Sequence, residues 1–403
     1  MWLQVVSLSF IICHLSFSRV AAQTFTATVV DARNGHPLSF ASVYARPGVS
    51  TITNAEGQFA IACDSADVLR ISYVGFQSKN VRAGRLGGRV GLQPMDLELQ
   101  EVTVYPIASL IRKVTKETLR QLQKNKKRKS QFFYRQTAFS DSTCYEFAEA
   151  FLQGHSAAWL RDLELVKGRY AAIRPDSLHY YSYYSNFYTF SQIEVAMKSN
   201  DWRDVWKMSM VPPLMPRYRD FYKVDYEIIS DAESRLIAIH FTPKPKIRDA
   251  ILDVTIYVDE ATCHLRKMEG VGRNVYILHR DWVSNVRKKQ VVFPTEFGFV
   301  VNMTEENGFL EVQSVSVNER HVFQGQQIDT HSILFNVGEL QKEKGKKLDR
   351  GDEMKFYGNL HGTIQEQGYD AQFWRNNEVV LRTPVEQQVM QLFERDNLFG
   401  VFK

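Results

Sequence analysis

The stretch FTATVVDARNGHPLSFASVYARPGVSTITNAEGQFAIACDSADVLRISYVGF (residues 25–76) decides the fold of the first part of this chain. It consists of short segments of alternating apolar and polar residues. Turns separate these segments at Asn34-Gly35, at residues 54–57 and at Gly75. Asn, Asp and Gly tolerate the positive φ angles that tight turns need. Short strands at this spacing predict a small antiparallel β-sandwich.

Three motifs lie in or just after this stretch: TITNAEGQFAI (residues 51–61), LRISYVGF (69–76) and LELQEVTVYP (97–106). Together they resemble the carboxypeptidase regulatory-like domain. That domain is a transthyretin-like β-sandwich found in outer-membrane receptors and other envelope proteins of glycan-scavenging Gram-negative bacteria. The resemblance implies a transthyretin- or Ig-like sandwich at residues 23–105 and an exported protein, and it implies nothing about chemistry. The whole arrangement resembles the barrel-less members of one such envelope family.

Residues 1–22 have the character of a signal peptide. An apolar run fills residues 2–17, and the small residues Val20-Ala21-Ala22 precede Gln23 where a signal peptidase would cut. No later apolar run reaches the roughly eighteen residues that a membrane helix needs. We therefore expect a mature chain with no transmembrane segment, exported to the periplasm or associated with the outer membrane.

Charge and cysteine content exclude two classes of protein. The chain has 50 Lys plus Arg and 45 Asp plus Glu, and removal of Arg19 with the signal leaves 49 against 45. This mild excess argues against a nucleic-acid partner, because such proteins carry a strong basic excess on one surface. Cys63, Cys144 and Cys263 remain after signal removal, and an odd number so far apart forms no disulfide framework. One disulfide pair is possible in an oxidising compartment, but buried free thiols are favoured.

Residues 106–130 predict a linking amphipathic helix. Apolar side chains recur at helical spacing from Ile107, and Pro106 suits a helix start. The densest basic cluster of the chain follows, comprising Lys124, Lys126, Lys127, Arg128 and Lys129. These cations either contact an anionic lipid or phosphate-rich partner, or they complement the dipole of a solvated helix end. The second interpretation is favoured.

Residues 131–403 predict a larger α+β domain built on a curved antiparallel sheet, so the chain as a whole is expected to be mainly β. Ile237, Ile239 and Phe241 alternate with polar or small residues, and so do the valines of residues 254–258. A turn at residues 259–262 leads into the partner strand of a hairpin. This segment resembles sheets of the lipoprotein-carrier and half-barrel type, which is an analogy of fold alone.

The end of the chain predicts an extended segment over residues 373–384 and a closing helix from Pro384 to Phe393. The expected inner side of that helix carries Val385, Val389, Leu392 and Phe393.

No catalytic motif is found. The sequence lacks the zinc-carboxypeptidase pattern, HExxH, a Walker loop and GxGxxG. The stretch around His155 and Ser156 lacks the second glycine of a nucleophile elbow. We therefore expect no catalytic residues, no metal, no cofactor and no enzymatic activity.

One cluster of aromatic residues is a candidate ligand-binding site. It comprises Tyr180, Tyr181, Tyr183, Tyr184 and Tyr188, with Trp202 further along the chain. Tyrosine rings stack on sugars or apolar groups, and their hydroxyls add hydrogen bonds. The alternative is that these residues favour strands and fill a core.

The sequence leaves three functional hypotheses. The first is a non-enzymatic cell-envelope protein, in which the sandwich contacts an envelope protein partner and the β-rich domain binds a partner or an apolar ligand. The second is a carbohydrate-binding accessory protein that uses the tyrosine cluster. Besides an envelope protein partner, a glycan or a lipid is a possible ligand of the chain. The third is a hydrolase without a recognised motif.

Overall fold

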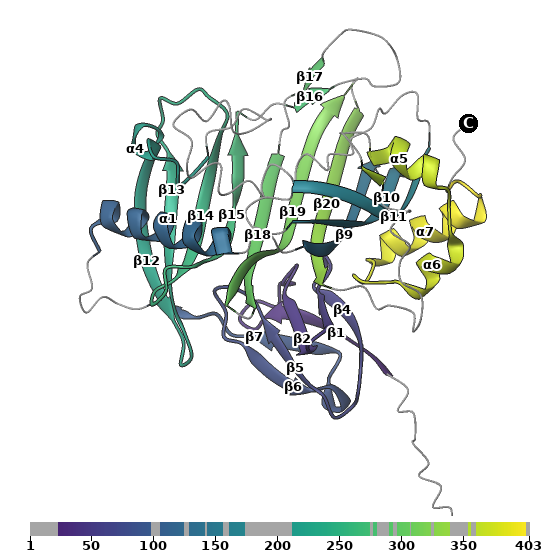
Figure 1. Ribbon diagram of the computed structural model, residues 1–403, viewed down its shortest axis with the longest axis horizontal. Helices are drawn as coiled ribbons and strands as arrows, with labels where there is room; N and C mark the ends of the chain where they lie inside the picture. The colour runs from purple at the N-terminus through teal and green to yellow at the C-terminus, as the bar shows by residue number, and fades with distance from the viewer. Residues whose placement is uncertain are drawn as a thin grey trace, which may run out of the picture.

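The computed structural model describes residues 23–97, 105–124, 129–141, 143–155, 161–173, 212–274, 277–279, 290–292, 296–306, 308–323, 326–338, 354–355 and 360–399. The chain is mainly β, as its sequence predicts. A seven-stranded sandwich lies below the strand ends of a large antiparallel sheet, and helices pack on that sheet (Figure 1). Residues 1–22 lie outside the described residues, so the signal peptide stays a prediction.

Two sheets form the sandwich. One contains β4 (Gln58–Cys63), β1 (Gln23–Asp31) and β7 (Arg89–Leu92), and the other contains β3 (Val49–Ile52), β2 (Ser42–Arg46), β5 (Val68–Ser72) and β6 (Lys79–Arg82). A short 3-10 helix, η1 (Ala83–Arg85), follows β6. The sequence predicts antiparallel pairing throughout, but β1 and β7 are parallel. They are far apart in the chain, so no hairpin turn fixes their direction.

The predicted turns of the sandwich are confirmed. Gly35, Gly57 and Gly75 all have positive φ angles, of 76°, 73° and 89°. At Gly57 a side chain is also excluded by space, because a Cβ would lie 2.6 Å from the carbonyl oxygen of Val29. The turns thus follow from residues whose backbone tolerates this conformation.

The large sheet has twelve strands in the order β21-β11-β10-β9-β20-β19-β18-β15-β14-β13-β12-β8, and all its neighbouring strands are antiparallel. The strands are β8 (Asp96–Leu97), β9 (Lys129–Ser140), β10 (Thr143–His155), β11 (Arg161–Ala172), β12 (Tyr222–Ser230), β13 (Arg235–Pro243), β14 (Ile251–Asp259), β15 (Leu265–Arg273), β18 (Glu296–Glu306), β19 (Phe309–Phe323), β20 (Gln326–Gly338) and β21 (Met354–Lys355). A separate hairpin joins β16 (Ile277–His279) to β17 (Gln290–Val292). The short helix α4 (Tyr218–Phe221) leads into β12.

One face of the large sheet packs against helix α1 (Ile107–Lys124), and we call it the helix face. Leu110, Ile111 and Val114 of α1 share a core cluster with Ile239 of β13 and Ile256 of β14. Figure 1 shows α1 lying across β12–β15. The predicted amphipathic pattern thus forms a helix whose apolar side is buried on the sheet.

The opposite face of the sheet carries the C-terminal helices. These are α6 (Ala371–Asn376) and α7 (Pro384–Arg395). The preceding helix, α5 (Leu360–Gln367), lies on the helix face instead, where its Leu360 and Ile364 join the same core cluster as α1. Helix α7 begins at Pro384, as predicted, and Thr383 and Glu386 form a capping box there. Trp374 of α6 and Phe393 of α7 are buried.

Two expectations for this C-terminal region are wrong. Phe373 lies in helix α6 rather than in an extended segment, because the side chain of Asp370 caps the helix by accepting a hydrogen bond from the Phe373 amide. The inner side of α7 carries Val389, Met390 and Phe393, whereas Val385 and Leu392 are 48% and 37% exposed. The helix is rotated so that Phe393 meets Phe147 of β10, which turns the other two side chains outward.

Candidate functional site

A groove of about 1220 Å³ lies between the sandwich and the large sheet. We call it the groove. One wall is the outward face of β2, β3 and β5. The other is one end of β9, β10, β18, β19 and β20, together with Leu236 of β13, Asp259 of β14 and Arg266 of β15. In Figure 1 this is the end of the sheet that meets the sandwich.

The sandwich wall follows from strand alternation. Val43, Leu69 and Ile71 point into the sandwich core, so their neighbours along β2 and β5 face outward. The register places Tyr44 of β2 directly opposite Ser50 on β3 and Arg70 on β5. Ser42 lies opposite Ser72 in the next row. This wall therefore presents a 43% exposed tyrosine ring surrounded by hydroxyl groups and one guanidinium.

The sheet wall is rich in amides and hydroxyls. Its polar residues are Ser130, Gln131, Gln153, Asn302, Thr304, Gln313 and Asn336. The Asn302 amide donates to Ser314 Oγ at 3.0 Å, and the Asn336 amide donates to Glu311 Oε2 at 3.1 Å. These contacts fix two of the amides that line the groove.

Most charged side chains at the groove form ion pairs, whereas Glu311 accepts hydrogen bonds from Asn336 and Ser130. Arg266 lies 3.7 Å from Asp259 and 3.5 Å from Glu305, and Glu305 Oε2 also lies 2.9 Å from His264 Nδ1. On the sandwich wall Arg70 faces Glu233 at 3.7 Å. Burial would raise the pKa of Asp259, but hydrogen bonds from Thr262 and the charges of Arg266 and His264 outweigh burial and lower it. The groove thus combines ionised, mutually compensating groups with neutral polar ones.

Contacts on both sides of the groove hold the sandwich in place. Lys267 of β15 lies 4.3 Å from the ring centre of Tyr73 and forms a 2.7 Å ion pair with Glu269. The Thr51 hydroxyl donates to the carbonyl of Val379 at 2.9 Å. Ile52 is buried in one cluster with Phe133, Phe335 and other residues of the sheet. The groove is therefore a built feature of the packing between the sandwich and the sheet.

The residues singled out by the sequence lie elsewhere. Tyr180, Tyr181, Tyr183, Tyr184, Tyr188 and Trp202 are outside the described residues, as are Lys126, Lys127 and Arg128. Lys124 is exposed at the end of α1, and Lys129 begins β9. Both candidate sites therefore stay predictions, and the structure does not relate them to the groove.

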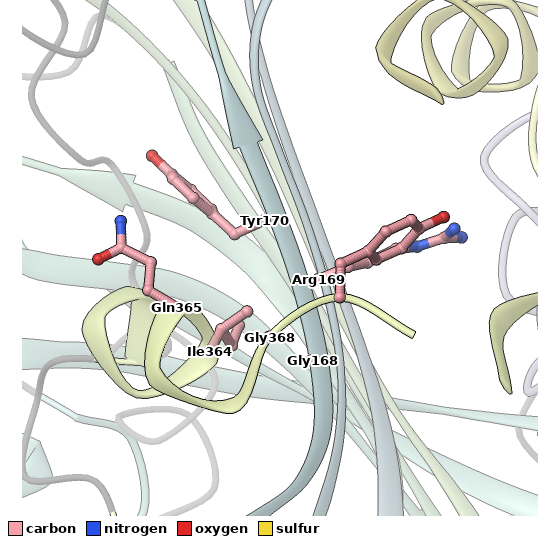
Figure 2. A pocket seen from close by; sticks show the side chains of 7 residues that line it. Gly168, Arg169, Tyr170, Ile364, Gln365 and Gly368 are labelled. Carbon is pink, nitrogen blue, oxygen red and sulfur yellow. The ribbon is translucent and has the colours of Figure 1, made fainter. Parts of the chain in front are cut away.

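A second cavity, shown in Figure 2, measures only about 10 Å³. It lies where Gly168 and Tyr170 of β11 meet Ile364 of α5. Gly168 lets the helix approach closely, since a Cβ there would lie 2.3 Å from Ile364 Cγ1. A cavity of this size holds one water molecule at most, so it offers no ligand site.

Metal ligands, cysteines and membrane-spanning helices are described here for the residues with assigned structure alone. There, no group of three or more His, Cys, Asp or Glu side chains is placed to hold a metal ion. Cys63, Cys144 and Cys263 are buried free thiols. None of the helices with described coordinates is long and apolar enough to cross a membrane.

Comparison with known families defines the class of the first part of the chain. A family model described as the CarboxypepD_reg-like domain matches residues 25–104. This segment is therefore a carboxypeptidase regulatory-like domain, as its motifs indicate. No curated protein matches the sequence of the chain.

Several solved structures show a weak likeness. A DUF1329 family protein from Desulfovibrio piger has 9% identity and a TM-score of 0.24, with 62% of this chain and 99% of that chain covered. A LolA superfamily protein from Nitrosomonas europaea has 10% identity and a TM-score of 0.21, with 60% and 99% covered. The Pseudomonas aeruginosa MucA/MucB complex has 9% identity and a TM-score of 0.17, with 55% of this chain and 93% of that chain covered. Scores this low carry no argument about function.

Proposed function

We propose that this protein is a non-enzymatic binding protein of the cell envelope and that the groove is its binding site. The observation that carries the proposal is a large groove whose walls carry both polar and apolar side chains, held in shape by contacts between the sandwich and the sheet. A site between two packed units is a common location for ligands. The carboxypeptidase regulatory-like domain then supplies one wall of the site.

The lining favours a polar ligand over an apolar one. Hydroxyl groups on the sandwich wall, and hydroxyls and amides on the sheet wall, lie among apolar side chains such as Phe76, Met95 and Phe335. These polar groups would lose hydrogen bonds to water without compensation if a wholly apolar molecule covered them. The apolar side chains of the helix face, by contrast, pack against α1 in a common core. Of the two ligand types that the sequence leaves open for the β-rich domain, a polar partner fits the groove better.

Binding without catalysis is supported by the state of the charged groups. Asp259 has a lowered pKa, so it is ionised at neutral pH and is a poor proton donor. Arg266 and Glu305 hold each other and neighbouring groups. Such pairing shapes a surface rather than activating a nucleophile.

An affinity experiment on the native envelope tests the proposal. The mature chain from Gln23 is immobilised, incubated with solubilised envelope of the producing organism, and compared with two variants. Ser50→Trp places an indole in the groove beside Tyr44, at an exposed position that does not disturb the core. Ala62→Trp adds the same ring at an exposed position of β4 outside the groove.

We expect the wild type and Ala62→Trp to retain the same envelope component and Ser50→Trp to lose most of it. Equal retention by all three proteins, with both variants folded by circular dichroism, would contradict the groove as the binding site.

A further inference from the structure

We infer that the ligand of the groove is a neutral oligosaccharide and that Tyr44 is its stacking platform. This inference rests on the proposed function and names the chemistry of the ligand. It is carried by the position of Tyr44, by the hydrogen-bonding groups around it and by the charge balance of the groove.

Tyr44 is a large aromatic side chain that the fold leaves 43% exposed on the sandwich wall. Its cross-strand neighbours Ser50 and Arg70 are both exposed and polar, and Tyr44 belongs to none of the apolar clusters that the described residues form. A ring in this setting offers one apolar face framed by hydrogen-bonding groups. The C–H face of a pyranose ring, bordered by its hydroxyls, is complementary to such a surface.

Both walls supply hydrogen-bonding side chains for which the described residues provide no side-chain partner. Ser42 and Ser72 on the sandwich, and Gln153 and Gln313 on the sheet, line the groove and make no side-chain hydrogen bond among the described residues. A hydroxyl or a primary amide both donates and accepts. Sugar hydroxyls also do both, so each can be paired in either sense.

The charges of the groove argue for a neutral sugar. Its two guanidinium groups already face carboxylates: Arg266 faces Asp259 and Glu305, and Arg70 faces Glu233. The third lining carboxylate, Glu311, is buried and accepts a hydrogen bond from the Asn336 amide. An acidic sugar would meet these carboxylates, and a cationic ligand would meet the two arginines. A neutral ligand disturbs neither set.

Size favours an oligosaccharide over a monosaccharide. The groove, at about 1220 Å³, exceeds the volume of about 300–1,000 Å³ typical of sites for single small molecules.

Calorimetric titration of the mature chain tests the inference. The neutral probes are maltohexaose, cellohexaose and mannohexaose, and tetragalacturonic acid is the acidic probe. We expect saturable binding of at least one neutral probe and none of the acidic one. Tyr44→Ala should weaken that binding by about fivefold or more, because an aromatic contact is lost, whereas Tyr44→Phe should retain most of it.

Val68→Ala is the matched control, since Val68 is 49% exposed on β5 of the same sheet but does not line the groove. Absence of binding to all three neutral probes, preference for the acidic probe, or equal binding by wild type and Tyr44→Ala would each overturn the inference. The proposed function is tested separately, by the envelope-retention experiment. If Ser50→Trp abolishes envelope retention but the retained material is protein or lipid, the groove is still the binding site and only the sugar assignment falls.

Discussion

Glu149 lies fully buried on β10 between its cross-strand neighbours Arg135 on β9 and Arg169 on β11. Arg135 Nε donates to Glu149 at 2.7 Å and Arg169 Nε donates to it at 2.8 Å, while Arg382 approaches it at 3.4 Å. Arg169 also lies 4.4 Å from the ring centre of Trp374 in α6. One carboxylate therefore joins three strands and the segment before α7.

Replacing this carboxylate should destabilise the protein strongly. Glu149→Gln would leave the buried guanidinium groups without their shared anion, and removing one partner of a buried pair typically costs about 3–5 kcal/mol. The free energy of unfolding by urea measures this loss. Glu378→Gln is the control. Glu378 is half-exposed, and the ion pair it forms among the described residues is with Arg382, at 2.9 Å. It should change stability by about 1 kcal/mol or less, and equal losses in both variants would contradict the central role of Glu149.

The same site predicts a dependence on pH. Burial would raise the pKa of Glu149, but the charges of Arg169, Arg135 and Arg382 outweigh burial and hold it well below its ordinary value of 4.5. A lowered pKa in the folded state contributes stability that is fully present above the unfolded value and is lost as pH falls. The stability gap between wild type and Glu149→Gln should therefore narrow as pH drops below about 4.5. A constant gap would show that Glu149 acts through shape rather than charge.

At the scale of single elements, Gly270 shows how two strands of the large sheet approach each other. A Cβ at this position of β15 would lie 2.1 Å from the carbonyl oxygen of Asp253 and 2.9 Å from the Cα of Val254, both in β14. These are backbone atoms of a paired strand, so they cannot move aside cheaply. A side chain here would have to push β14 and β15 apart.

Gly270→Ala should accordingly destabilise the protein by about 1–3 kcal/mol, the usual cost of overpacking. Gly298→Ala on β18 is the matched control, because the nearest atom to its Cβ would be 3.9 Å away. Thermal unfolding of both variants checks the difference. Similar melting temperatures for the two would show that β14 can shift without cost.

Local sequence patterns predict elements well where one face is buried and the other is not. Ile237, Ile239 and Phe241 alternate as expected, and all three are buried on the helix face. The pattern fails where the neighbouring surface determines which side of a helix is buried. In α7, nothing in the helix sequence shows that Met390 rather than Leu392 faces the sheet. The cluster around Glu149 also could not be predicted from local sequence, because strand register brings Arg135, Glu149 and Arg169 together.

At the scale of the whole molecule, the groove exists only because distant segments pack together. Alternation alone places Tyr44 and Ser42 on the outward face of β2, and this much could be predicted. The opposite wall could not, because its residues begin at Ser130 and extend to Val337. The contacts that fix it, such as Thr51 with Val379 and Tyr73 with Lys267, join parts of the chain with no shared local pattern.

The central claim, that the groove binds the ligand, is tested most directly by hydrogen–deuterium exchange with and without the retained envelope component. We expect slower exchange in β2, β3 and β5 and at the ends of β9 and β10 that meet the sandwich, with no change in α1. The same pattern should be absent in Ser50→Trp. Slower exchange confined to α1 and the strands beneath it, with the groove unchanged, would place the ligand on the helix face and contradict the account.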